Sequence, residues 1–174
     1  EARRVISEKY PEQYKSRNLT VLTIGKKGYD YFRKTNVKML PDQNGLLHDL
    51  TFDNVSLVAE QVMKSFTSKE YDRVEFIYNQ FKNAAVQNLT NEQFLPVETV
   101  AAGKKVEAPA DYIYEPDKEG IVKELIPKSL KIQFYKAVLD SFVAEHGARM
   151  TAMHKATDNA TELRDQLKLT YNKA

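Results

Sequence analysis

The sequence contains no cysteine among its 174 residues. This absence excludes disulfide scaffolds, thiol nucleophiles, zinc ribbons and iron–sulfur clusters from these residues, and it leaves no thiol for a redox switch. Hydrophobic residues make up 42% and charged residues 29%, which is an ordinary soluble composition. A chain of this length can therefore bury a core without covalent or metal staples.

The sequence also lacks a dominant charge and a long hydrophobic run. Its 26 basic and 24 acidic residues give a formal net charge of +2, so no nucleic-acid or acidic-lipid partner is indicated. No apolar run approaches the length of a membrane span, and no signal-peptide pattern opens the sequence. The chain begins at Glu1 and ends at Ala174, each inside a helical pattern, so we expect it to be the middle of a longer protein.

Residues 1–116 alternate between helical and extended patterns. Leu19–Ile24, closed by Gly25, has the composition of a buried strand, Arg73–Tyr78 is predicted as a second strand, and weaker extended runs follow at 93–97 and 112–114. Three helices are predicted: Ala2–Tyr10, stopped by Pro11; Lys27–Lys34; and a helix capped by Asp53, with apolar residues at helical spacing (Val55, Val58, Ala59, Val62, Met63, Phe66). This order predicts an α/β domain with a small parallel or mixed sheet flanked by helices.

Residues 117–174 give almost only helical signals. Proline is favoured at the first helical position, so we expect a helix from Pro127 to the end of the sequence. At 1.5 Å per residue this helix would be about 72 Å long. A compact domain of this size has a radius of gyration of about 16 Å, so the helix is expected to protrude from the domain.

The apolar pattern of this helix changes along its length. Leu130, Phe134, Val138 and Phe142 are spaced by four and suit packing against the sheet. From residue 150 a 3-4-3-4 spacing typical of a coiled-coil seam follows, with two polar residues at core positions: Met150, Met153, Thr157, Ala160, Arg164, Leu167, Tyr171 and Ala174. Small residues at Ala152, Ala156 and Ala160 would let another backbone approach. The sequence has no second helix of matching length, so the partner must come from a further segment of the same protein or from another chain.

No catalytic, metal or cofactor site emerges from the sequence. Ile24–Gly28 follows a strand but lacks the spacing of a phosphate-binding loop, which favours a tight strand-to-helix turn. His146 and His154 are eight residues apart, which is too far for paired helical metal ligands, and His48 lies in a polar turn. An acidic cluster (Asp111, Glu115, Asp117, Glu119) reads as a solvated turn or as a recognition edge.

Several blocks of the sequence closely resemble the gamma subunit of F-type ATP synthases. In chain order they are Ile24–Gly28, Tyr112–Pro116, and on the long helix Ser141, Glu145, Ala148–Met150, Ala152–Met153, Ala156–Asn159 and Leu169–Ala174. The resemblance covers nearly the whole chain. It implies a Rossmann-like α/β base domain over 1–116, incomplete at its N-terminus, and a C-terminal helical segment over 117–174. In that segment a long protruding helix forms one half of an antiparallel coiled coil.

The resemblance implies a central rotor shaft without an active site of its own. The shaft couples proton-driven rotation of the c ring to ATP synthesis or hydrolysis at the hexamer of alpha and beta subunits, and the epsilon subunit lies alongside. It places the protein on the cytoplasmic face of a bacterial inner membrane, which it contacts only through the c ring. No catalytic residue, metal or cofactor is expected.

The resemblance also assigns roles to individual residues. Tyr112, Tyr114 and Glu115 would contact the c ring, although the two tyrosines could instead pack into the domain's own edge. Arg149 would face the catalytic hexamer or the N-terminal helix, or make an ordinary ion pair on the helix surface. The coiled-coil seam toward the N-terminal helix, which is missing from this sequence, would be formed by Met150, Met153, Ala156, Ala160 and Leu167.

Two alternatives remain at the level of the sequence. The first is a small nucleotide-binding α/β module with a helical arm, which predicts a phosphate loop that the sequence lacks. The second is an α/β interaction or adaptor module that oligomerises through its C-terminal helix. The adaptor predicts self-association through residues 150–174, whereas a shaft with an intramolecular coiled coil predicts a monomer.

Overall fold

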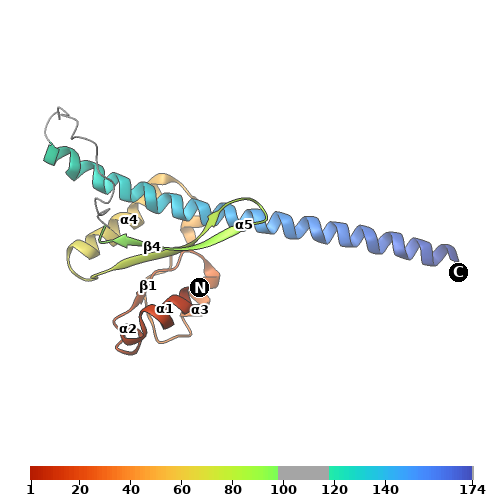
Figure 1. Cartoon of the computed structure of the whole chain (residues 1–174), viewed down its shortest axis with the longest axis horizontal. Coiled ribbons are helices and arrows are strands. Elements are labelled where there is room, and N and C mark those ends of the chain that lie inside the picture. Colours follow the sequence, from red (N-terminus) through yellow and green to blue (C-terminus); the bar gives the residue numbers. More distant parts are fainter. Residues whose placement is uncertain (98–117, 174) are drawn as a thin grey trace, which may run out of the picture. The chain divides into compact units, whose positions relative to one another are not determined.

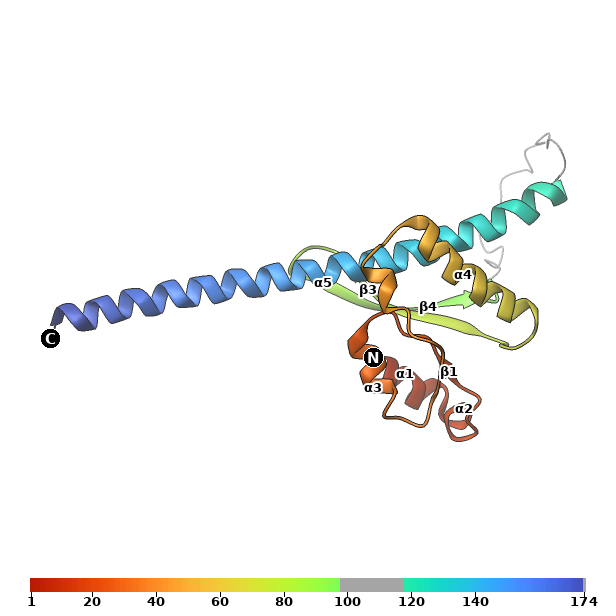
Figure 2. The same cartoon turned by 180° about the vertical axis from the view of Figure 1, so that it is seen from behind.

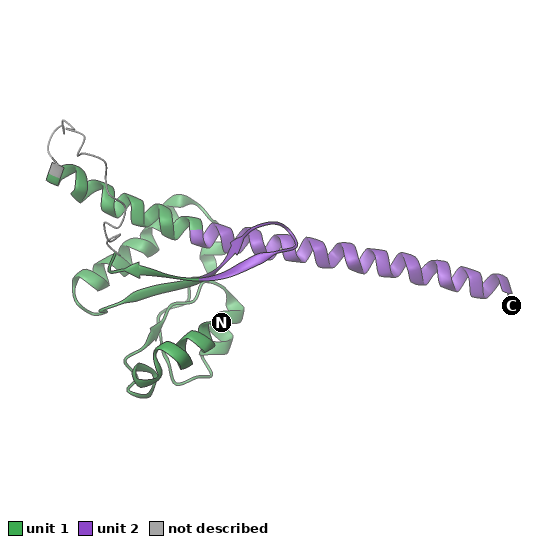
Figure 3. Cartoon of the chain, in the orientation of Figure 1, with its two compact units in different colours: residues 1–77, 91–136 green, residues 78–90, 137–174 purple. Residues whose placement is uncertain are grey.

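A computed structural model describes residues 1–97 and 118–173. Its elements, in chain order, are α1 (Ala2–Lys9), α2 (Pro11–Lys15), β1 (Thr20–Val21), α3 (Lys26–Phe32), β2 (Lys38–Met39), the 3-10 helix η1 (Asn44–Leu47), α4 (Phe52–Thr67), β3 (Val74–Phe81), β4 (Gln87–Leu95) and α5 (Lys118–Lys173) (Figure 1). The chain divides into two compact units, 1–77 with 91–136 and 78–90 with 137–174 (Figure 3). Strands β3 and β4 and helix α5 contribute residues to both units.

The expected α/β class is confirmed, but the strands form two separate two-stranded sheets in the part of the chain that the structure describes. β1 and β2 pair in parallel, with Thr20 opposite Lys38 and Val21 opposite Met39. β3 and β4 are joined by only five residues, which permits only an antiparallel hairpin.

The predicted buried strand over residues 19–24 is wrong in length and in burial. Only two of its residues have ladder partners on β2, and Leu19, Val21, Leu22 and Ile24 are half-buried rather than buried. A strand in a two-stranded sheet cannot be enclosed in the way that a central strand is. The second predicted strand is confirmed as β3, while the weak run at 93–97 proves to be the end of the longer strand β4.

Gly25 makes the turn between β1 and α3. Its φ of 123° lies in a region that L side chains rarely adopt, which explains why a glycine ends the apolar run. The tight strand-to-helix turn is therefore the conformation that the structure shows.

Helix α4 is capped two residues earlier than predicted. Thr51, not Asp53, is the N-cap, and its hydroxyl accepts a hydrogen bond from the backbone N–H of Asn54. Asp53 lies in the first turn, where its negative charge interacts favourably with the helix dipole. The predicted apolar face is confirmed at Val55, Val58 and Ala59, which are buried.

Helix α5 begins at Lys118, so the prediction that Pro127 starts it is wrong. Pro127 lies within the helix, where its missing N–H removes one backbone hydrogen bond. A 56-residue helix tolerates this loss because the flanking turns continue and the buried side chains of Leu130 and Phe134 hold the next turns in place. No helix in the described residues is long and apolar enough to cross a membrane.

The core of the first unit joins the hairpin, α4 and the beginning of α5. The rings of Phe76, Phe94 and Phe134 pack together, with centroids 5.6–6.4 Å apart. Figures 1 and 2 show α4 beside this part of α5. There Phe52 meets Tyr135 edge to face at 5.6 Å, and the Lys131 ammonium donates to Glu60 at 2.5 Å. Of the four residues predicted to pack on the sheet, Leu130 and Phe134 in this unit and Val138 in the second unit are buried, whereas Phe142 is only half-buried.

Candidate interaction surface on α5

The last third of α5 exposes apolar side chains to solvent. Every residue from Ala152 to Lys173 is exposed, including Met153 (62%) and Leu167 (61%). Exposing large apolar groups in this way is costly unless another surface covers them. The predicted seam residues Met153, Ala156, Ala160 and Leu167 lie on this exposed segment, and Met150, just before it, is 51% exposed.

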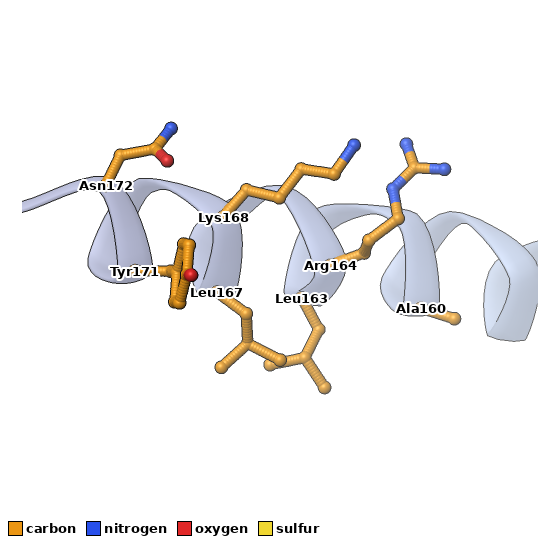
Figure 4. A pocket seen from close by; sticks show the side chains of 7 residues that line it. All are labelled: Ala160, Leu163, Arg164, Leu167, Lys168, Tyr171 and Asn172. Atoms are coloured by element: carbon orange, nitrogen blue, oxygen red, sulfur yellow. The ribbon is translucent and has the colours of Figure 1, made fainter.

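A shallow groove at the end of α5 shows how the apolar and basic side chains separate. It is lined by Ala160, Leu163, Arg164, Leu167, Lys168, Tyr171 and Asn172. In Figure 4 Leu163 and Leu167 project to one side of the helix, while Arg164 and Lys168 project away from it. The charged groups of Arg164 and Lys168 therefore lie on the side of the helix away from the two leucines.

Leu163 is a surface residue that sequence reasoning missed. Counting from Met150 in steps of three and four puts Arg164 at a core position, whereas the steps Met153, Ala156, Ala160, Leu163 and Leu167 are apolar throughout. Comparing both heptad registers along the helix would have identified the register that contains Leu163. Leu163 is 57% exposed, as open to a partner as Leu167.

A second apolar stripe lies at the beginning of α5, in the first unit. Val122, Leu125 and Ile132 are all exposed, and their spacing of three and seven places them on one side of the helix. Leu130 and Phe134 on the opposite side are buried. Sequence reasoning missed this stripe because it read the region only for packing onto the sheet.

Arg149 pairs with Glu145 one turn earlier on α5, and both side chains remain more than half exposed. An ion pair in such an exposed position contributes little to stability. The guanidinium keeps donors for a further contact. Its proposed role toward the catalytic hexamer or the N-terminal helix stays a prediction.

The residues expected to contact the c ring, Tyr112, Tyr114 and Glu115, lie outside the described residues. The same holds for Asp111 and Asp117 of the acidic cluster and for Ala174. Among the residues that are described, no group of histidine, aspartate and glutamate side chains could hold a metal ion. His48, His146 and His154 are each exposed.

The strongest electrostatic cluster in the first unit surrounds Glu75 on β3. Its carboxylate accepts hydrogen bonds from the Tyr10 hydroxyl at 2.6 Å, from the Asn91 amide at 3.0 Å and from Arg73 Nε at 2.9 Å. Burial alone would raise the pKa of Glu75, but these hydrogen bonds and the nearby Lys9 outweigh burial and lower the pKa. Burial and the contact with Glu75 raise the pKa of Tyr10 to about 12. The cluster therefore ties the end of α1 to the hairpin.

Comparisons with known proteins identify the family. A family model described as ATP synthase matches residues 1–174. The chain is 57% identical to the ATP synthase gamma chain of Flavobacterium psychrophilum over 92% of its own length, and 50% identical to that of Christiangramia forsetii over 98%. The chain belongs to the ATP synthase gamma-chain family.

A solved structure agrees with this assignment. The central stalk and c-ring structure of the Tetrahymena thermophila mitochondrial ATP synthase contains a chain that is 25% identical, with a TM-score of 0.53 over 79% of this chain. The present gamma-chain sequence spans 56% and 59% of the two bacterial relatives. It also covers 60% of the Tetrahymena chain.

Proposed function

We propose that this chain is part of the central-stalk rotor subunit of an F-type ATP synthase. The subunit couples proton-driven rotation of the c ring to ATP synthesis or hydrolysis at the alpha/beta catalytic hexamer. The observation that carries the proposal is membership of the gamma-chain family across all 174 residues. The chain supplies mechanical coupling rather than catalysis, so the subunit itself is not an enzyme.

The exposed apolar face of α5 supports a shaft made of two helices. A single helix with a leucine- and methionine-lined face in water gains free energy when a second helix buries that face. We propose that Met150, Met153, Ala156, Ala160 and Leu167, together with Leu163, pack on an N-terminal helix of the same protein that precedes residue 1. Interdigitated side chains along such a seam resist torsion collectively, which is what a rotating shaft requires.

The other partners follow from the same proposal. Tyr112, Tyr114 and Glu115 contact the polar loops of the c ring, and Arg149 contacts the hexamer or the N-terminal helix. The alpha, beta and epsilon subunits are direct partners, and the membrane is reached only through the c ring, on the cytoplasmic face of a bacterial inner membrane. Nucleic acid is not a partner, since the net charge of +2 offers no basic surface of the required strength. Residues 1–116 form the base domain and 117–174 the shaft segment.

The deciding experiment is a gentle purification of the tagged native protein from its source membranes, with mass spectrometry of what accompanies it. Recovery with the alpha, beta and epsilon subunits and the c ring, and with ATPase activity in the eluate, is expected. Recovery of the protein alone, or only with copies of itself, contradicts the rotor function. That result would favour an adaptor that oligomerises through α5.

A further inference from the structure

The tip of the β3–β4 hairpin is attached to α5 at three levels within the second unit. The backbone N–H of Asn79 donates to the Ser141 hydroxyl at 3.0 Å. Ten residues along the helix, the Thr151 hydroxyl lies 3.2 Å from the Ala84 carbonyl and 3.0 Å from the Gly147 carbonyl of its own helix. Between them, the Ala84 backbone rests against Gly147.

Gly147 lies in the interior of the continuous helix α5, where glycine is unfavourable. Glycine in a helix interior costs about 1 kcal/mol relative to alanine. A Cβ at position 147 would lie 3.2 Å from the Ala84 Cα and 3.3 Å from the Phe81 ring, closer than side chains ordinarily approach. The close approach of the hairpin therefore accounts for the glycine.

The attachment occupies one side of α5 and leaves the candidate seam free. Ser141, Gly147 and Thr151 follow one another at helical spacing, with Ala144, which is 1% exposed, among them. Thr151 and Ala160 are nine residues apart, or about two and a half helical turns, and so face opposite directions. A second helix could pack on the Ala160 side without displacing the hairpin.

We propose that the hairpin tip, residues 78–90, is a clasp that locks α5 against rolling about its own axis and carries part of the torsion in the shaft. Rolling would draw the Ser141 and Thr151 hydroxyls away from their hairpin partners. It would also replace Gly147 by a residue with a side chain under Ala84, where no space exists. The torsional role rests on the proposed rotor function, whereas the clasp itself does not.

The clasp is tested first by amide hydrogen exchange in the complete purified protein. Gly147→Leu is expected to speed exchange of the Asn79 amide at least tenfold by lifting the hairpin. The amides of Asn83 and Val86 bond to each other's carbonyls within the turn and serve as an unchanged internal reference. Lys155→Leu is the matched control, because Lys155 is exposed on the same side of α5, one turn beyond Thr151 and two turns beyond Gly147. An unchanged Asn79 amide would overturn the clasp.

The torsional role is tested in membrane vesicles containing the assembled complex. Gly147→Leu is expected to retain ATP hydrolysis but to lower the protons pumped per ATP at least threefold, while Lys155→Leu leaves that ratio unchanged. The double variant Ser141→Ala, Thr151→Val removes both hydroxyl contacts without adding bulk, and should lower the ratio in the same direction. Faster Asn79 exchange with unchanged pumping would show that the clasp bears no torsion. If the protein does not purify with catalytic subunits, the rotor function fails, and with it the torsional role, while the exchange result still decides the clasp.

Discussion

At the scale of single residues, two kinds of position contribute to the stability of the fold. Two glycines allow a backbone angle or a close contact that other residues would not, and one carboxylate accepts several hydrogen bonds. Gly25 and Gly147 are required for different reasons, the first by its backbone angle and the second by the space beside it. Glu75 gathers hydrogen bonds from Tyr10, Arg73 and Asn91, which come from the end of α1 and the hairpin region.

Gly25→Ala is expected to destabilise the protein by about 1–3 kcal/mol, because its φ of 123° strains any residue with a Cβ. Gly45→Ala is the matched control, since open space surrounds Gly45 and its backbone angle is ordinary. Urea unfolding of both variants measures the difference. Equal effects at the two positions would argue against the turn conformation seen at Gly25.

Glu75→Gln is expected to destabilise the protein at neutral pH by about 1 kcal/mol, through weaker hydrogen bonds to a neutral acceptor. The folded-state pKa of Glu75 lies below its ordinary value of 4.5. Its contribution is therefore present above about pH 4.5 and is lost as the pH falls through the lower folded-state pKa. The stability gap between wild type and variant should close over that range in urea titrations. A gap independent of pH, or an equal effect of Glu12→Gln at an exposed position, would contradict this role.

At the scale of elements, α5 changes its environment along its length. In the first unit one side of the helix is buried by the hairpin and α4, and in the second unit the hairpin tip covers only a short stretch before the helix becomes fully exposed. Stability effects of substitutions should therefore depend on position within a single helix more than on residue type.

Phe134→Ala is expected to cost about 3–5 kcal/mol, because it removes one ring from the three-ring core with Phe76 and Phe94. Ile132→Ala, two residues earlier and 57% exposed, should change the stability of the isolated protein far less. Thermal unfolding of the two variants compares them directly. Comparable losses would mean that the stripe around Ile132 is already covered.

Leu163→Ala should destabilise the protein in its native complex by about 2 kcal/mol or more if a second helix covers the seam. Leu169→Ala is its control, because Leu169 is 62% exposed but lies six residues further along, on a different side of the helix. Heat-induced release of the protein from the purified complex provides the measurement. Equal sensitivity of the two leucines would place the partner on another face.

At the scale of the whole molecule, the proposed function requires partners beyond the described residues. The apolar side chains on the end of α5 have no cover within the described residues, and the chain spans less than three fifths of the two bacterial relatives. In the proposed rotor, the base domain must also be attached to the c ring that turns it.

Replacing Tyr112 and Tyr114 with alanine is therefore expected to reduce the c ring recovered with the purified complex at least fivefold. Recovery of the alpha and beta subunits should be unchanged, since aromatic anchors at a protein interface carry much of its binding energy. Subunit ratios from mass spectrometry of the tagged complex give the result. Parallel loss of every partner would indicate instead that the tyrosines support the fold of the base.

The amino-acid sequence by itself determined the α/β class, the long helix, its buried residues Leu130, Phe134 and Val138, and the family, because hydrophobic periodicity and the motif blocks on α5 can be read within one segment. Only the tertiary structure decided that α5 is already helical at Lys118 and why Gly147 is a glycine, whereas the cap of α4 by Thr51 is a local contact with Asn54 that the sequence reading assigned to the wrong residue. The start of α5 at Lys118 overrides the local preference of Pro127, and the clasp at Gly147 joins residues more than sixty positions apart. Periodicity shows which side chains of a segment are buried but not which distant segment covers them, so the sequence could not show that Ala84 lies against Gly147.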